Sequence, residues 1–129
     1  MSGDLMQPGA DAMLDGTAIP TTLYLQGHTD DPGADGTANV GANSTRIALA
    51  SWNAAESGGA GFRRKTNSTT VLSGAASTDE TWTWVTLWSD ATDGTVWFVD
   101  QLASSVDLIT GQAVQIIAGA VSIAFPVKA

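Results

Sequence analysis

The stretch 80–102, "ETWTWVTLWSDATDGTVWFVDQL", decides the fold. Two runs rich in β-branched and aromatic residues flank the Asp-Gly pair at 93–94, and Asp-Gly between such runs is a strong hairpin signal. Successive side chains of a strand point to opposite faces. The pattern therefore predicts one face that carries four residues of the first run, Trp82, Trp84, Thr86 and Trp88. Because both faces hold apolar residues, we expect one to be core and the other an interface between subunits.

Short β-type runs continue on both sides of this hairpin, and turn signals such as "SGGAG" at 57–61 separate them. The pattern predicts an all-β protein, a single antiparallel β-sandwich of jelly-roll type over residues 20–129. Residues 1–19, broken by Pro8 and Gly9, are predicted to form an N-terminal arm or short helix. The expected strands are 21–27, 45–52, 62–72, 80–89, 95–102, 104–109, 112–118 and 120–127.

The composition excludes several classes of function. The 129 residues suffice for one domain, and the net charge of −8 with only five basic residues argues against a nucleic-acid partner. There is no cysteine, so neither a disulfide nor a thiolate metal site is possible. No apolar run approaches the roughly 20 residues of a membrane span, so no membrane contact is expected.

The segment "LYLQGHTDDPGADGTANV", residues 23–40, is the most polar candidate for chemistry. It combines a lone His28 with Asp30, Asp31 and Asp35, but the sequence offers no G-x-S-x-G nucleophile motif. A calcium loop of the EF-hand type fails because the twelfth position, counted from Asp31, is Ala42. We therefore expect no catalytic residue and no cofactor, and we interpret the Asp, Pro and Gly residues as turn formers. A looser surface Ca²⁺ site in the Asp30–Asp35 loop is the alternative.

The stretch "FRRKT" at 62–66 holds three of the five basic residues. One interpretation is a contact with an anion or with an acidic surface of a neighbouring copy. The other is a solvated strand face that protects a sheet edge. The candidate interface residues of the sequence are Trp82, Trp84, Trp88, Arg63 and Arg64.

The loop also carries a resemblance. Residues 28–39 match the pattern H-T-x-D-P-G-x-x-G-T-A-N at every specified position, and the chain resembles a family of small virion proteins of tailed bacteriophages. The resemblance extends to "MLDGTAIPTTLYLQGHT", "TNSTTVLSG" and the final "ITGQAVQIIAGAVSIAFPV". The chain departs from the family pattern in "NSTRIAL" and at Gln112, where the family turn has Asp.

The resemblance implies a structural component of the virion, assembled in the host cytoplasm, with no enzymatic activity. It favours a capsid-surface decoration protein, which stabilises the head by binding the major capsid protein or other virion proteins. A homo-oligomer is expected, with a trimer favoured. The alternative is a minor tail or tail-fibre protein, including one that binds a receptor or carbohydrate. An isolated carbohydrate-binding module fits least.

Overall fold

The computed structural model describes residues 19–59 and 61–126, and the regular elements in this part are nine strands. The predicted N-terminal arm lies outside the described residues, apart from Ile19. The strands are β1 (Leu23–His28), β2 (Ile47–Leu49), β3 (Glu56–Gly59), β4 (Phe62–Thr66), β5 (Val71–Leu72), β6 (Glu80–Trp88), β7 (Val96–Leu108), β8 (Gln115–Ile116) and β9 (Ser122–Pro126).

The chain divides into two compact units. Unit 2 comprises Thr22–Leu49 and Val71–Gln115, and unit 1 comprises Met1–Thr21, Ala50–Thr70 and Ile116–Ala129. The strand pairs in both units are antiparallel, so the prediction of an all-β, antiparallel protein is confirmed. The arrangement of the sheets as a single sandwich over residues 20–129 stays a prediction.

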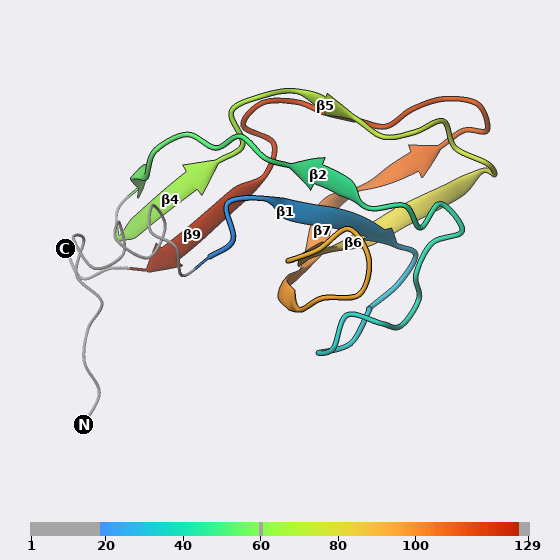
Figure 1. The fold of residues 1–129 in the computed structure, drawn as a ribbon, viewed down its shortest axis with the longest axis horizontal. Helices are drawn as coiled ribbons and strands as arrows, with labels where there is room; N and C mark the ends of the chain where they lie inside the picture. Colours follow the sequence, from blue (N-terminus) through green and yellow to red (C-terminus); the bar gives the residue numbers. More distant parts are fainter. Residues whose placement is uncertain (1–18, 60, 127–129) are drawn as a thin grey trace. The chain divides into compact units, whose positions relative to one another are not determined.

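Unit 2 contains a four-stranded sheet in the order β2-β1-β6-β7 (Figure 1). β1 is interior to the sheet, and five of its six residues are buried. β6 and β7 pair antiparallel, and their connection contains Asp93 and Gly94, whose φ angles are 54° and 77°. The connection, residues 89–95, is longer than the two-residue turn that Asp-Gly typically forms, and the N–H of Ser89 donates to the carbonyl of Thr95 at 2.9 Å. The predicted hairpin is therefore confirmed.

A register shift in this hairpin corrects the prediction for the tryptophans. Trp82 pairs with Val106 and Trp84 with Gln101, so β7 bulges between these two pairs, and the predicted strands 95–102 and 104–109 form one strand. A Cβ on Gly27 would lie 2.0 Å from the Trp82 ring, so the ring occupies the space where a side chain of residue 27 would be. Gly27 pairs with Val85, and directly paired residues share a face. The prediction that Trp82 shares a face with Trp84 is therefore wrong, because the irregularity moves Trp82 to the Val85 face.

Unit 1 contains a three-stranded sheet in the order β3-β4-β9. A two-stranded ladder pairs β5, a strand of unit 2, with β8. β3 lies in the "SGGAG" region that was predicted to be a turn. The prediction is correct in part: the chain reverses between Gly59 and Phe62, which pair, but residues 57–59 belong to the strand, with Ser57 opposite Arg63. The predicted strand 62–72 is also interrupted, since β4 ends at Thr66 and β5 begins at Val71.

Asn67, in the interruption between β4 and β5, is 1% exposed and binds several backbone groups of unit 1. Its Nδ2 donates to the carbonyl of Ile117 at 2.9 Å, and its Oδ1 accepts from the N–H of Val121 at 2.9 Å. Its backbone N–H donates to the Val121 carbonyl, and its own carbonyl accepts from Gly119. One side chain therefore fixes the turn that leads into β9.

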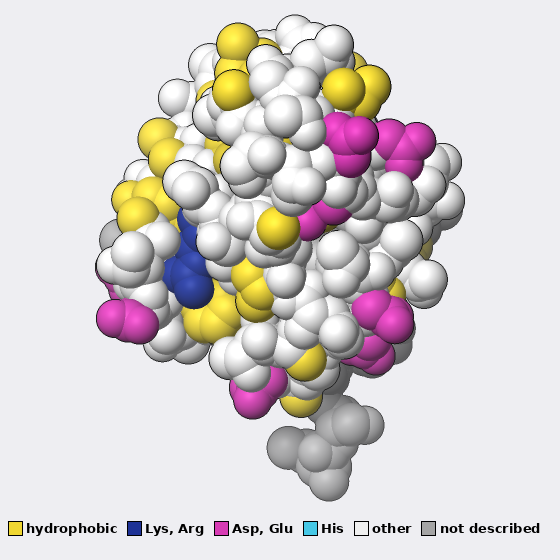
Figure 2. All heavy atoms as spheres, turned by 90° about the vertical axis from the view of Figure 1, so that its right-hand side faces the viewer, with side chains coloured by type: hydrophobic (Ala, Val, Ile, Leu, Met, Phe, Trp, Pro, Cys, Tyr) yellow, Lys and Arg dark blue, Asp and Glu magenta, His cyan; other side chains and the backbone are white. Residues whose placement is uncertain are grey.

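The charge of the chain is distributed unequally between the two units. Unit 2 contains nine acidic side chains and one basic side chain, Arg46, a formal charge of −8. In the described residues of unit 1 the charged side chains are Glu56, Arg63, Arg64 and Lys65. Acidic side chains are spread over the face that Figure 2 shows, with a small basic patch among them.

Candidate functional site

The loop of residues 29–39 folds back onto the strand that it leaves. The N–H of Thr29 donates to the carbonyl of Asn39 at 3.0 Å, and the N–H of Gly41 donates to the carbonyl of Gly27 at 3.2 Å. His28 forms an isolated antiparallel bridge with Val40. Pro32 in the loop is fully buried. Backbone hydrogen bonds between the end of β1 and residues 39–41 therefore hold the two ends of the loop together.

Gly36 brings the middle of this loop against β6 and β7. It is buried with a φ of 73°, and a Cβ there would lie about 3 Å from side-chain atoms of Val96 and Trp88. Any other residue at this position would be strained by the positive φ, and its Cβ would be too close to the neighbouring side chains. The loop therefore requires glycine there.

His28 is fully buried, and both of its ring nitrogens have partners. Nδ1 lies 2.9 Å from the carbonyl oxygen of Ala38, and Nε2 lies 2.8 Å from Oγ1 of Thr86. A carbonyl only accepts, so Nδ1 carries the proton and Nε2 of the neutral ring accepts from the Thr86 hydroxyl. The Thr86 Oγ1 in turn accepts from Nε1–H of Trp88 at 2.7 Å. Three side chains thus form one buried relay from β6 to the loop.

The distance of 2.8 Å between Thr86 Oγ1 and His28 Nε2 is that of a catalytic hydroxyl and its base, but the other requirements of such a pair are not met. Thr86 and His28 are each 0% exposed, so no substrate can reach the hydroxyl. Burial is the largest effect on the pKa of His28 and lowers it; hydrogen bonds to backbone groups raise it, and the nearby charge of Arg46 lowers it. The pKa therefore lies below its ordinary value. The ring is therefore neutral and holds the loop to the sheet.

The three aspartates of the loop act as turn formers. Asp31 Oδ1 accepts from the N–H of Gly33 at 2.8 Å, and Asp30 Oδ1 accepts from the N–H of Asp31 at 2.8 Å. Asp35 Oδ1 accepts from the hydroxyl and the N–H of Thr37, which lower the pKa of Asp35. In the described part of the chain, no three His, Asp or Glu side chains converge in a way that could hold a metal ion.

A second cluster, which sequence reasoning missed, fixes the segment that follows the loop. Glu80 at the start of β6 accepts from the N–H of Ala42 at 2.7 Å and from Nδ2 of Asn43 at 2.9 Å. It also accepts from Nε1–H of Trp82 at 2.8 Å. Burial alone would raise the pKa of Glu80, but the hydrogen bonds together outweigh burial, so the pKa lies below its ordinary value. The carboxylate therefore stays ionised.

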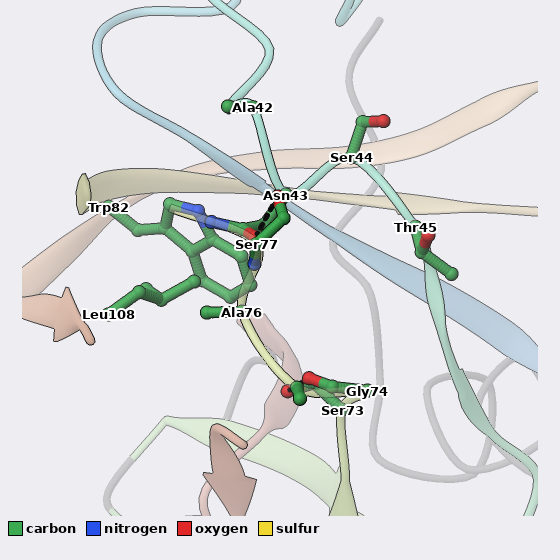
Figure 3. Close-up of a pocket in the computed structure, with 11 residues that line it drawn as sticks. Ala42, Asn43, Ser44, Thr45, Ser73, Gly74, Ala76, Ser77, Trp82 and Leu108 are labelled. Carbon is green, nitrogen blue, oxygen red and sulfur yellow. Dashed lines mark hydrogen bonds between the residues drawn. The ribbon is translucent and has the colours of Figure 1, made fainter. Parts of the chain in front are cut away.

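Asn43 extends this cluster to the segment before β6. Its Oδ1 accepts from the N–H of Ser77 at 2.7 Å, and its Nδ2 also donates to the carbonyl of Thr78. Figure 3 shows Asn43 and Ser77 facing each other beside the Trp82 ring, at a pocket of about 210 Å³. Asn43 and Glu80 are 37 residues apart, so no local signal in the sequence identifies the pair.

The predicted interface tryptophans differ in exposure. Trp82 and Trp88 are 3% and 6% exposed, whereas Trp84 is partly exposed. The guanidinium of Arg46 lies 4.0 Å from the ring centroid of Trp88 and donates to the carbonyls of Asp90 and Asp93. Trp82 and Trp88 therefore contribute to the core of unit 2, and the role of the three residues at an interface stays a prediction.

The predicted basic residues lie in unit 1, on opposite faces of β4. Arg64 pairs with Glu56 across the strands, and its Nε lies 3.3 Å from Oε1 of Glu56. Arg63 is the next residue, so its side chain points to the other face, the face of Ser57. The sequence did not separate these two arginines. Their role at an interface also stays a prediction.

These observations define a class of protein. The buried polar groups bind the chain's own loops, and no helix in residues 19–59 and 61–126 could cross a membrane. The described part of the molecule is thus an all-β protein whose buried polar side chains hold its own loops. The family model of the podophage GP4 fiber I protein gp80 matches residues 1–124, and the chain belongs to this family. No curated protein matches the chain.

Membership in this family resolves part of what the sequence predicted. The protein is a phage fibre protein and a component of the virion, and the predicted lack of enzymatic activity is confirmed. The family supports the fibre alternative better than the capsid decoration protein that the sequence favoured. The loop motif that led to the resemblance is also explained, because His28, Pro32, Gly36 and Asn39 each close or pack the loop.

Proposed function

We propose that this protein is a subunit of the tail fibre of a phage, and that it works as a rigid, non-catalytic module. The observation that carries this proposal is the family match over 124 of the 129 residues. The geometry supports it, because His28 holds the loop to the sheet and the loop aspartates form the turns of the loop.

We propose further that the subunit assembles with copies of itself, as a trimer, and contacts other virion proteins. Several large apolar side chains support this part of the proposal. Leu72 is 64% exposed, Phe62 47% and Trp97 40%. Exposed apolar side chains indicate a protein–protein contact where they gather in a patch.

A structural role is favoured over carbohydrate recognition by the burial of the tryptophans. A ring that stacks on a sugar needs an open face, and Trp82 and Trp88 are almost completely covered by their own chain. Trp82 and Trp88 therefore stabilise the fold, and receptor binding through the exposed Trp97 is the second candidate.

The test is the position and the number of copies in intact particles. A tagged copy is introduced into the phage, and gold-labelled particles are imaged while quantitative mass spectrometry counts the copies per particle. We expect label at the tail and a copy number far below that of the major capsid protein in the same particles. Label spread over the head, with hundreds of copies, would overturn the proposal.

A further inference from the structure

One face of the sheet in unit 1 is exposed and combines an apolar side chain with both signs of charge. The register places Phe62, Arg64 and Glu56 on the same face as Ala124 of β9. Phe62 is 47% exposed, the side chains of Arg64 and Glu56 are 43% and 50% exposed, and Ala124 is exposed. We name the face made by these four residues the Phe62 face.

The opposite face of the same sheet has a different character. Lys65 pairs with Ile123, which is 4% exposed, and Arg63 shares this face. The Nζ of Lys65 lies 5.9 Å from the centroid of the Trp52 ring. Among the described side chains of this sheet, the exposed Phe62 ring and the exposed Arg64–Glu56 ion pair therefore share one face.

Charge restricts which surfaces of two copies can meet. Unit 2 carries a formal charge of −8, so contact between the acidic surfaces of two copies is repulsive. The Phe62 face carries one cation and one anion that lie 3.3 Å apart, so it has no net charge. When copies meet around a symmetry axis, Arg64 of one copy can approach Glu56 of the next, and the same contact repeats for every copy.

The shape of the face permits a close approach. The neighbours of Phe62 include Gly59, its partner on β3, and Ala124 has only a methyl side chain. Phe62, which pairs with Gly59 on β3 and with Pro126 on β9, is therefore the exposed aromatic side chain of this face. An aromatic anchor of this kind, with a polar rim, is typical of the centre of an interface.

We propose that the Phe62 face is the contact between copies of this chain, with Phe62 at its centre and Arg64 of one copy paired to Glu56 of the next. The occupant is a second copy because the face is complementary in charge to itself, whereas unit 2 repels itself. This inference rests on the proposed function in one respect, the self-assembly of the fibre subunit.

The test compares two substitutions with the same change of charge in the full-length chain. Phe62→Glu introduces a carboxylate at the centre of the contact, and Ile109→Glu introduces one at a similarly exposed apolar residue of unit 2. Sedimentation velocity over a range of concentrations gives the association constant. We expect Phe62→Glu to weaken association by about tenfold or more, since central apolar anchors dominate interfaces, and Ile109→Glu to leave it unchanged.

A charge exchange provides a second readout that does not depend on Phe62. Glu56→Arg and Arg64→Glu, each alone, place like charges opposite each other across the contact and should weaken association. The double variant restores opposite charges and should recover it. Far-ultraviolet circular dichroism confirms that every variant is folded.

Three results would overturn the inference: a monomeric wild type, equal effects of Phe62→Glu and Ile109→Glu, or a double charge exchange that recovers nothing. None of these results affects the location of the protein in the particle, which the labelling experiment measures separately. A failure of the contact and a failure of the fibre assignment are thus distinguishable.

Discussion

His28 in unit 2 and Asn67 in unit 1 each hold a segment of backbone in place, but with different hydrogen-bonding groups. Each is a buried polar side chain, 0% and 1% exposed, that binds backbone carbonyls of a returning segment. Asn67 binds the backbone alone and stays neutral at every pH. His28 binds one carbonyl and one hydroxyl, so its acceptor nitrogen is a site that acid can protonate.

The comparison shows that the hydrogen bonds that hold a loop can be sensitive to pH or independent of it, according to the side chain that makes them. The amide of Asn67 offers fixed donors and a fixed acceptor, so its contacts persist across the physiological range. The imidazole of His28 accepts from Thr86 only in its neutral form. The two regions should therefore differ in how they respond to substitution and to acid.

The largest effect is expected for His28→Ala. The substitution leaves a cavity and removes the partners of the Ala38 carbonyl and the Thr86 hydroxyl, which should cost about 3–5 kcal/mol of unfolding free energy. Denaturation by urea at pH 7.5 and at fixed protein concentration measures it. His28→Asn, whose Nδ2 can replace Nδ1–H, is the control and should lose less. An equal loss in both variants would contradict the role of the Ala38 contact.

Asn67→Ala should have the next largest effect. It removes no aromatic volume but leaves the Ile117 carbonyl and the Val121 N–H without their side-chain partners, at a cost of about 2–4 kcal/mol. Asn67→Asp keeps the acceptor for Val121 but buries a carboxylate oxygen against the Ile117 carbonyl, so it should lose at least as much stability as Asn67→Ala. The same urea denaturation at pH 7.5 gives both values. A loss below about 0.5 kcal/mol for Asn67→Ala would show that Asn67 does not hold this turn.

Thr86→Val tests the middle of the relay. Valine has nearly the shape of threonine, but Nε2 of His28 and Nε1–H of Trp88 would lose their partner, which should cost about 1–3 kcal/mol. Thr83→Val is the matched control on the same strand, because the Thr83 hydroxyl donates to the exposed carbonyl of Thr29. A larger loss for Thr83→Val than for Thr86→Val would contradict a stabilising relay.

The smallest effect is the dependence of stability on pH, and it distinguishes the two regions. His28 is the single histidine, and its pKa in the folded protein lies below the ordinary 6.5. The unfolded chain therefore binds more protons below about pH 6.5, and stability should fall as pH decreases through this value. Asp35, Asp79 and Glu80 also have lowered pKa values, but their contribution is lost only at more acidic pH.

Urea denaturation at pH 7.5, 6.5 and 5.5 measures this dependence. Asn67→Ala should keep the wild-type slope over this interval, because it introduces no titratable group, whereas His28→Asn should flatten it. A slope that persists in His28→Asn would assign the dependence to another group.

The sequence by itself determined the local features of this protein. The Asp93-Gly94 turn, the strands on both sides of it and the turns made by Asp31 and Asp35 depend on a few adjacent residues, because they follow from the backbone preferences of those residues. The loop motif also pointed to a phage virion protein, although the sequence favoured the head over the fibre.

Only the tertiary structure decided the distant contacts. Thr86, the partner of His28, is 58 residues away, and Asn67 contacts Ile117 across 50 residues. The face of Trp82 depends on a bulge in the neighbouring strand, and β3 is a strand because β4 lies beside it. Alternation along one strand predicts a face only while the register is unbroken, and a Gly-rich segment has few side chains to signal its pairing. Such contacts depend on which segments the fold brings together, and no short stretch of sequence contains that information.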